Sequence, residues 1–103
     1  MQFILSMAIG LFLSLPWIAD AKPSHHEYCK DQAKAAGVLM KARQDGILLQ
    51  DLMNALNGEK EKTILLMVDE AYRRPISPTN AGKKAAIDEF QNQMYATCIK
   101  AAN

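Results

Sequence analysis

The chain has 103 residues, half of them hydrophobic, and a formal net charge of +1, so its length leaves room for one domain. The 12 Lys and Arg residues are interleaved with 11 Asp and Glu residues, without the clustered basic stripe that binds nucleic acid. The first 17 residues raise the hydrophobic fraction and have to be set aside before the fold is considered.

Residues 1–21 have the pattern of a secretory signal. An apolar run is followed by Pro16 and by small residues at the cleavage spacing, Ala19 and Ala21. The run has no Lys or Arg before it, so the amino terminus alone would supply its positive charge. An uncleaved membrane anchor is the alternative, but a membrane span needs about 20 apolar residues, and this run is shorter. We expect cleavage after Ala21.

Cleavage would leave a single domain, residues 22–103, in the periplasm or outside the cell, with no further membrane span. Because Asp20 is the only charged side chain that would be lost, its net charge would be +2. Two cysteines remain, Cys29 and Cys98, and in an oxidising compartment they predict one disulfide. A metal pair would need closer spacing and more ligands, and a reactive thiol pair would need an activating motif.

The first predicted helix covers residues 24–45. Its apolar and small residues recur every three or four positions, at Cys29, Ala33, Ala36 and Met40, which places them on one face. Ser24 is a candidate amino-terminal cap, and Gly46 suits the left-handed conformation that ends a helix. The small residues would let another helix approach closely.

Arg43 continues the same spacing, which places it on the inward edge of this helix. A half-buried guanidinium needs carboxylates or carbonyl oxygens as partners. We interpret Arg43 as a structural clamp that meets either Glu70 or free carbonyls at the end of the third helix. A role in contacting a partner is the alternative.

Three further helices are predicted. Residues 49–57 carry an apolar stripe that suits core packing or, alternatively, an adaptable groove, and Asn57-Gly58 ends this helix. Residues 59–74 form the third helix, which Pro75 ends, and a stiff loop follows. The fourth helix starts at a Thr79 or Asn80 cap and continues to about residue 101. The predicted inward positions of the third helix are Ile64, Leu65, Val68, Ala71 and Tyr72, and those of the fourth are Ile87, Phe90, Met94, Cys98 and Ala101.

These elements predict an all-α fold, a compact bundle of about four helices. If Cys29 bonds to Cys98, the first and last helices lie antiparallel, with Ala33 near Met94. Such a register would bring Arg43 close to the start of the fourth helix.

Catalytic and metal-binding motifs are weak. No nucleophile with a nearby base, metalloprotease motif or glycine-rich phosphate loop is present in the sequence, so we do not expect an enzyme or a cofactor. His25 and His26 are adjacent at a helix start, which is a poor ligand set, and they make metal binding only a remote alternative.

A set of short motifs resembles a group of small exported helical proteins from Gram-negative bacteria and their prophages. The motifs lie at Tyr28-Cys29, Ala42–Gly46, Ala71-Tyr72, Pro75, Ala86–Phe90, Tyr95 and Cys98. The resemblance implies a periplasmic location, a helical fold and a Cys29–Cys98 bond. It supplies no catalytic residues, and it marks four recurrent motif positions as a possible clamp or partner-binding set: Arg43, Gln44, Gly46 and Tyr72.

Two functions follow as hypotheses. The first is a periplasmic binding or inhibitory protein whose partner is an unidentified protein of the envelope or an exported enzyme. The second is a structural or stress-related envelope protein that associates with itself through the Leu and Met surface of the second helix.

Overall fold

The structure, a computed structural model, describes residues 25–102 and places four α-helices there with no strand between them. The helices are α2 (His25–Gln44), α3 (Leu49–Ala55), α4 (Lys62–Tyr72) and α5 (Asn80–Ala102). The predicted signal, its cleavage site and the Ser24 cap lie outside the described residues. The all-α prediction is confirmed, and the helix order matches the four predicted segments.

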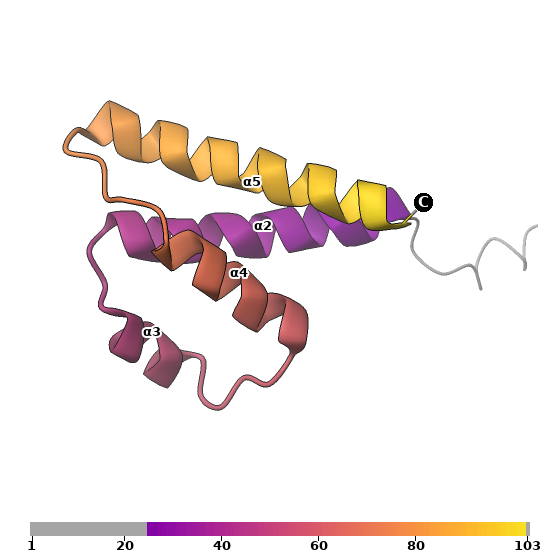
Figure 1. Ribbon diagram of the computed structural model, residues 1–103, viewed down its shortest axis with the longest axis horizontal. Coiled ribbons are helices and arrows are strands. Elements are labelled where there is room, and N and C mark those ends of the chain that lie inside the picture. The colour runs from indigo at the N-terminus through magenta and orange to yellow at the C-terminus, as the bar shows by residue number, and fades with distance from the viewer. Residues whose placement is uncertain (1–24, 103) are drawn as a thin grey trace, which may run out of the picture.

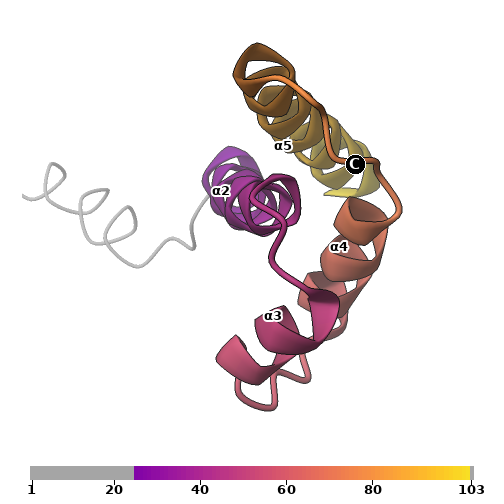
Figure 2. The same ribbon diagram turned by 90° about the vertical axis from the view of Figure 1, so that its left-hand side faces the viewer.

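The two long helices, α2 and α5, lie side by side and antiparallel, as predicted (Figure 1). α4 packs against α2, and α3 lies away from α5, beyond α2 and α4 (Figure 2). Gly37 lies where α2 meets α5, and a Cβ atom there would collide with the side chain of Gln91. Glycine in mid-helix costs about 1 kcal/mol relative to alanine, and here it permits the close approach of the two long helices.

The core lies between α2, α4 and α5, with one residue from α3. Eight of its buried residues form one cluster: Ala36, Leu39, Met40, Leu52, Met67, Val68, Ala71 and Phe90. The periodicity correctly identified most of these positions, but it missed Leu39 and Met67. Ala101, predicted to face inward, is exposed in the last turn of α5.

The helix ends follow local chemistry. The side chain of Glu61 accepts a hydrogen bond from the N–H of Ile64 at 3.1 Å, so α4 begins at Lys62, later than predicted. Thr79 caps α5 as predicted, because its Oγ1 accepts from the N–H of Gly82 at 3.0 Å. Asn57 and Gly58 have positive φ angles, 49° and 79°, which ends α3 as expected.

Among the described residues, none of the helices has the length and apolar character needed to cross a membrane.

Candidate functional site

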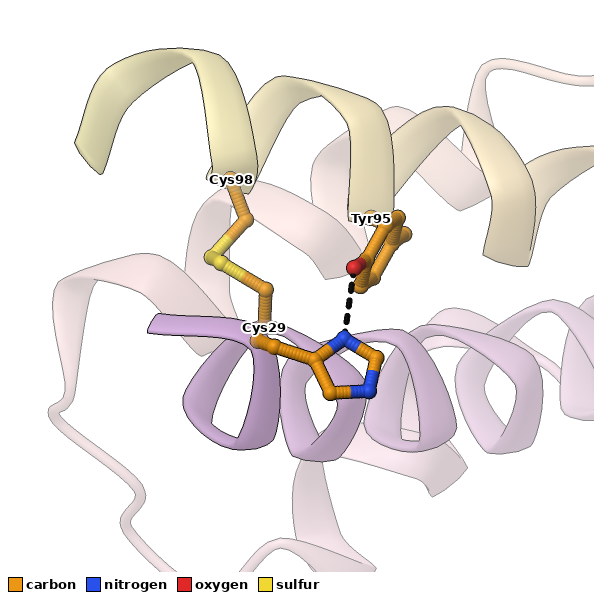
Figure 3. The surroundings of a disulfide bond; sticks show 4 residues. Cys29, Tyr95 and Cys98 are labelled. Carbon is orange, nitrogen blue, oxygen red and sulfur yellow. Dashed lines mark hydrogen bonds between the residues drawn. A yellow bond between two sulfur atoms is a disulfide. The ribbon is translucent and has the colours of Figure 1, made fainter. Parts of the chain in front are cut away.

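A disulfide joins the start of α2 to the end of α5 (Figure 3). Cys29 and Cys98 are bonded with their Cα atoms 5.5 Å apart, which confirms the predicted pairing. One turn away, Nδ1 of His26 lies 2.8 Å from the hydroxyl of Tyr95, and the two rings meet edge to face. This end of the helix pair is therefore held by a covalent bond and by a polar contact.

The two histidines do not lie in a metal-binding cluster. Within residues 25–102, no three His, Cys, Asp or Glu side chains gather closely enough to hold a metal ion. His26 contacts Tyr95, and His25 lies at the edge of an apolar groove described below.

Gly46 ends α2 in a left-handed conformation, with φ of +80°. Its N–H donates to the carbonyl of Arg43 and the N–H of Ile47 donates to the carbonyl of Ala42, both at 3.0 Å. This pair of hydrogen bonds is the Schellman arrangement, which satisfies the last carbonyls of the helix. No atom lies within 4 Å of where a Cβ of Gly46 would be, so its backbone angle and not crowding favours glycine here.

Gln44, in the last turn of α2, is a buried polar residue that binds the loop between α4 and α5. Its side chain is 1% exposed. Its Nε2 donates to the carbonyl of Pro75 at 2.9 Å, and its Oε1 accepts from the N–H of Ser77 at 2.8 Å. Nε2 also lies 3.5 Å from the sulfur of Met40. The amide thus pairs with two backbone groups of the loop.

Arg43 holds the same loop from the neighbouring position. Its Nε donates to the carbonyl of Arg74 at 2.8 Å, and its guanidinium lies 5.3 Å from the centre of the Tyr72 ring. The Tyr72 hydroxyl in turn donates to the carbonyl of Ile47 at 2.8 Å. Of the two kinds of partner predicted for Arg43, the structure shows the backbone carbonyl, that of Arg74. The carboxylate of Glu70 instead lies 3.9 Å from the guanidinium of Arg74.

We call Arg43, Gln44 and Tyr72 the loop clamp. The structure brings these three motif residues together, while Gly46 serves the helix end beside them. Sequence spacing placed Arg43 inward but gave Gln44 no role. A signal was present, because Gln44 lies four residues after Met40 and therefore continues the buried stripe.

Burial raises the pKa of the Tyr72 phenol above its ordinary value of 10.0, and the positive charge of Arg43 partly opposes this effect. Because the protonated hydroxyl donates to Ile47, both the burial and this hydrogen bond favour the neutral phenol.

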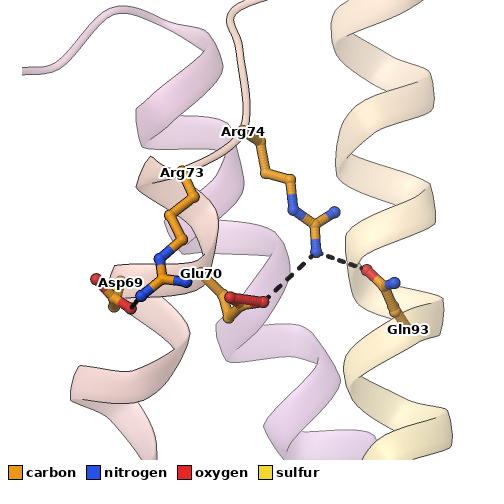
Figure 4. A network of polar contacts seen from close by, with 5 residues as sticks. All are labelled: Asp69, Glu70, Arg73, Arg74 and Gln93. Atoms are coloured by element: carbon orange, nitrogen blue, oxygen red, sulfur yellow. Dashed lines mark hydrogen bonds and ion pairs between the residues drawn. The ribbon is translucent and has the colours of Figure 1, made fainter.

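A polar network connects the end of α4 to α5 (Figure 4). Arg74 donates through Nη2 to Oε1 of Gln93 at 2.8 Å, and its guanidinium lies 5.0 Å from the centre of the Phe90 ring. Within α4 and its last turn, Nη2 of Arg73 lies 2.8 Å from Oδ2 of Asp69. These side chains are partly exposed, so the ion pairs contribute little to stability.

A hollow of about 400 Å³ lies between the loop that joins α4 to α5 and the helix α5 itself.

A larger hollow lies at the disulfide end, between α2, α4 and α5. We call it the end groove. Its volume is about 570 Å³, within the range of ligand-binding pockets. The described residues that line it include no Lys, Arg, Asp or Glu: His25, Tyr28, Gln32, Thr63, Leu66, Met67, Met94, Thr97, Cys98 and Ala101. Two large apolar side chains of the end groove are open to solvent: Leu66 is 56% exposed and Tyr28 is 51% exposed.

Gln32, one of the residues that line the end groove, has a buried oxygen without a hydrogen-bond partner. The atom is Oε1. A buried acceptor without a donor costs about 1 to 3 kcal/mol, and such atoms require an explanation in a folded protein. The sequence periodicity gave neither Gln32 nor Leu66 a role, because the groove forms only where three helices meet.

The chain was compared with protein-family models, curated proteins and solved structures, and no match was found.

Proposed function

We propose that this chain is a small exported binding protein that holds an uncharged, apolar segment of another envelope or exported protein in the end groove. Such binding would inhibit a partner whose apolar segment is needed for its own activity. The observation that carries this proposal is the groove itself, a hollow of about 570 Å³ with exposed apolar side chains and no Lys, Arg, Asp or Glu in its described lining.

Export supports the proposal in two ways. The signal-like segment predicts passage into the periplasm or beyond, and the Cys29–Cys98 disulfide is compatible with an oxidising compartment. The disulfide also fixes two walls of the end groove, since Cys29 lies on α2 and Cys98 lines the groove from α5. A preformed groove binds at a lower entropic cost than one that has to be ordered by its ligand.

Site-specific photocrosslinking in the native envelope tests this function. A photoreactive amino acid at Leu66 would lie in the end groove, and the same amino acid at Val38 is the matched control. Val38 is 68% exposed and lies on the solvent face of α2 between Lys34 and Lys41. We expect a discrete adduct with a different protein from position 66 and none from position 38.

The captured protein would then be purified and its affinity measured. We expect Leu66→Asp to weaken binding at least tenfold, which corresponds to about 1.4 kcal/mol, whereas Val38→Asp leaves it unchanged. Equal labelling from both positions, or an affinity insensitive to Leu66→Asp, would remove the end groove as the binding site.

Self-association is the second candidate function, and one observation favours it. Apolar side chains are exposed at the start of α3, where Leu48 is 68% exposed and Leu49 is 46% exposed. Other residues of the predicted Leu and Met surface of this helix face the core: Leu52 is buried in the core cluster, and Met53 packs against it. Light scattering across a concentration series tests this function, and a strict monomer would remove it.

A further inference from the structure

Two helices are each followed by a pair of residues that can form a ring with each other. Asp45-Gly46 follows the last residue of α2, and Asn57-Gly58 follows the end of α3. In such a pair the backbone nitrogen of the glycine can attack the side-chain carbonyl carbon of the residue before it. Glycine favours this attack because it has no Cβ atom beside the nitrogen and rotates freely. The same chemistry therefore has two locations in this chain, and their surroundings differ.

Asp45-Gly46 is protected by the structure. The N–H of Gly46 donates to the carbonyl of Arg43 at 3.0 Å, so its nitrogen is held in the helix end. The carboxylate of Asp45 lies 2.8 Å from Nζ of Lys41, and an ionised carboxylate is also a poor target for a nucleophile. Both reacting groups of this pair are thus occupied.

Asn57-Gly58 is open. Within residues 25–102, the N–H of Gly58 donates to no other group and the side-chain amide of Asn57 makes no hydrogen bond. Both residues are exposed, and no atom lies within 4 Å of where a Cβ of Gly58 would be. The loop from α3 to α4 runs along the edge of the molecule farthest from α5 (Figure 1). Water therefore reaches both reacting groups.

The backbone of Asn57 has to rotate before the ring can close. Its φ is 49°, in the left-handed region, where the next nitrogen is turned away from the side chain. The N–H of Asn57 donates to the carbonyl of Asn54 at 3.1 Å. The N–H of Glu59 donates to the carbonyl of Leu56 at 3.2 Å. Both bonds lie at the end of a helix of 7 residues, and such short exposed ends open locally at a small cost in free energy.

We propose that Asn57 is a deamidation site of the folded protein. Hydroxide removes the proton of the Gly58 N–H, and the nitrogen attacks Cγ of Asn57. The bond between Cγ and the side-chain nitrogen breaks, and that nitrogen takes up a proton from water and leaves as ammonia. The product is a succinimide ring. Water then opens the ring at one of its carbonyl carbons, which leaves either an aspartate or an isoaspartate at position 57.

The modification changes the end of α3 in two ways. It places a carboxylate beside the last turn, where the helix dipole is negative and a negative charge is destabilising. The isoaspartate form also adds a methylene group to the backbone, which disrupts the left-handed turn of Asn57 and Gly58. α3 reaches the core cluster through Leu52. We therefore expect the modification to release α3 from the core.

Incubation of the purified, disulfide-bonded protein under mildly alkaline, non-denaturing conditions tests the proposal. Peptide mapping by mass spectrometry follows position 57, where replacing the amide NH2 by OH changes the mass, and an isoaspartyl methyltransferase assay detects the isoaspartate form. We expect modification to accumulate at position 57. Asn54, Asn80 and Asn92 lie in helices and precede Ala or Gln, so they are internal controls and should remain unchanged. A folded protein whose position 57 stays unmodified while the urea-unfolded chain reacts would overturn the proposal.

Asp45→Asn is the matched control, because it places the same dipeptide at the end of α2. The nitrogen of Gly46 donates to Arg43, whereas that of Gly58 is free. We expect position 57 to react about three- to tenfold faster than position 45, the range that corresponds to one hydrogen bond. Equal rates at the two positions would show that the free N–H does not select Asn57, which would overturn the structural basis of the proposal.

Unfolding of the whole chain is the competing route to the same product. Gln44→Met separates the routes, because all hydrogen bonds of the Gln44 amide in the described chain go to Met40 and to the loop before α5. The substitution raises the population of unfolded chain. We expect position 57 to react at the wild-type rate, because the reaction requires only local opening of the turn. A rate that rises with the unfolded population would overturn the assignment to the folded protein.

The release of α3 has its own readout. The modified protein has an additional negative charge and separates from the unmodified protein on cation exchange. Amide hydrogen exchange should be faster in residues 49–55 of the modified protein. Asn57→Gln lengthens the side chain and disfavours ring closure, so this variant should keep slow exchange after the same incubation. Equal exchange in the two proteins would overturn the release of α3.

Discussion

Oε1 of Gln44 accepts a hydrogen bond from the backbone N–H of Ser77 across 33 residues of sequence, at 2.8 Å. The same amide donates to Pro75, so one side chain of α2 fixes the course of the loop that leads into α5. The loop contains two prolines and forms few backbone hydrogen bonds of its own. Its position therefore depends on partners from α2.

Replacing Gln44 should destabilise the fold. Gln44→Met keeps most of the volume but leaves the Pro75 carbonyl and the Ser77 N–H without their partner. We expect a loss of about 1 to 3 kcal/mol in the free energy of unfolding, measured by urea denaturation. Gln50→Met, at an exposed position of α3, is the control and should stay within about 0.5 kcal/mol of the wild type. Equal effects of the two substitutions would show that the loop does not need the amide.

Arg43→Ala should lower thermal stability appreciably, whereas Lys41→Ala should not. Arg43 loses a hydrogen bond to Arg74 and its contact with the Tyr72 ring, together worth about 1 to 3 kcal/mol. Lys41 forms an exposed ion pair with Asp45, and such pairs contribute about 0 to 1 kcal/mol. Thermal melts at matched protein concentration measure both. If the variants melt alike, Arg43 does not hold the loop, and a partner-facing role for Ala42–Gly46 gains support.

Tyr72 should make stability sensitive to alkaline pH. Its pKa is raised in the folded state, so the folded protein keeps the phenol proton to higher pH than the unfolded chain does. This contribution to stability is complete below the unfolded pKa of about 10, and it is lost as pH rises through the higher folded pKa. Ionisation also removes the donor to Ile47.

Tyr72→Phe isolates that contribution. At neutral pH the variant should be less stable by about 0.5 to 1.5 kcal/mol, the value of one hydrogen bond. Above about pH 10 the difference from the wild type should shrink, because the wild-type protein then loses the same interaction. Unfolding midpoints measured from pH 7 to 11 would check this, and a constant difference across that range would contradict it.

Loss of the disulfide should have the largest effect among these predictions. Cys29 and Cys98 are separated by 69 positions, and releasing a loop of this length stabilises the unfolded chain by about 4 to 4.5 kcal/mol on the chain-entropy model. Urea denaturation with and without reductant measures the difference. Intact mass should increase by two hydrogen atoms on reduction. A Cys29→Ser/Cys98→Ser double variant that unfolds at the wild-type urea concentration would contradict the prediction.

Reduction should also affect the end groove, since Cys98 lines it and the disulfide fixes α2 to α5 there. The Leu66 photocrosslink provides the readout, and its yield should fall when the protein is reduced before irradiation. The contact between His26 and Tyr95 lies one turn away and would still join α2 to α5 after reduction.

The sequence by itself determined the helices, most of their buried faces and the pairing of the two cysteines. The helices depend on signals within a few residues, such as the spacing of Cys29, Ala36 and Met40, and the pairing follows because the sequence has two cysteines. The tertiary structure alone decided what Gln44 contacts and where Gln32 lies. Gln44 meets backbone groups more than 30 positions away, and Gln32 lies in a groove that three helices form together. Helical periodicity describes one helix at a time, so it identifies a side chain that faces inward but not the atoms that it meets.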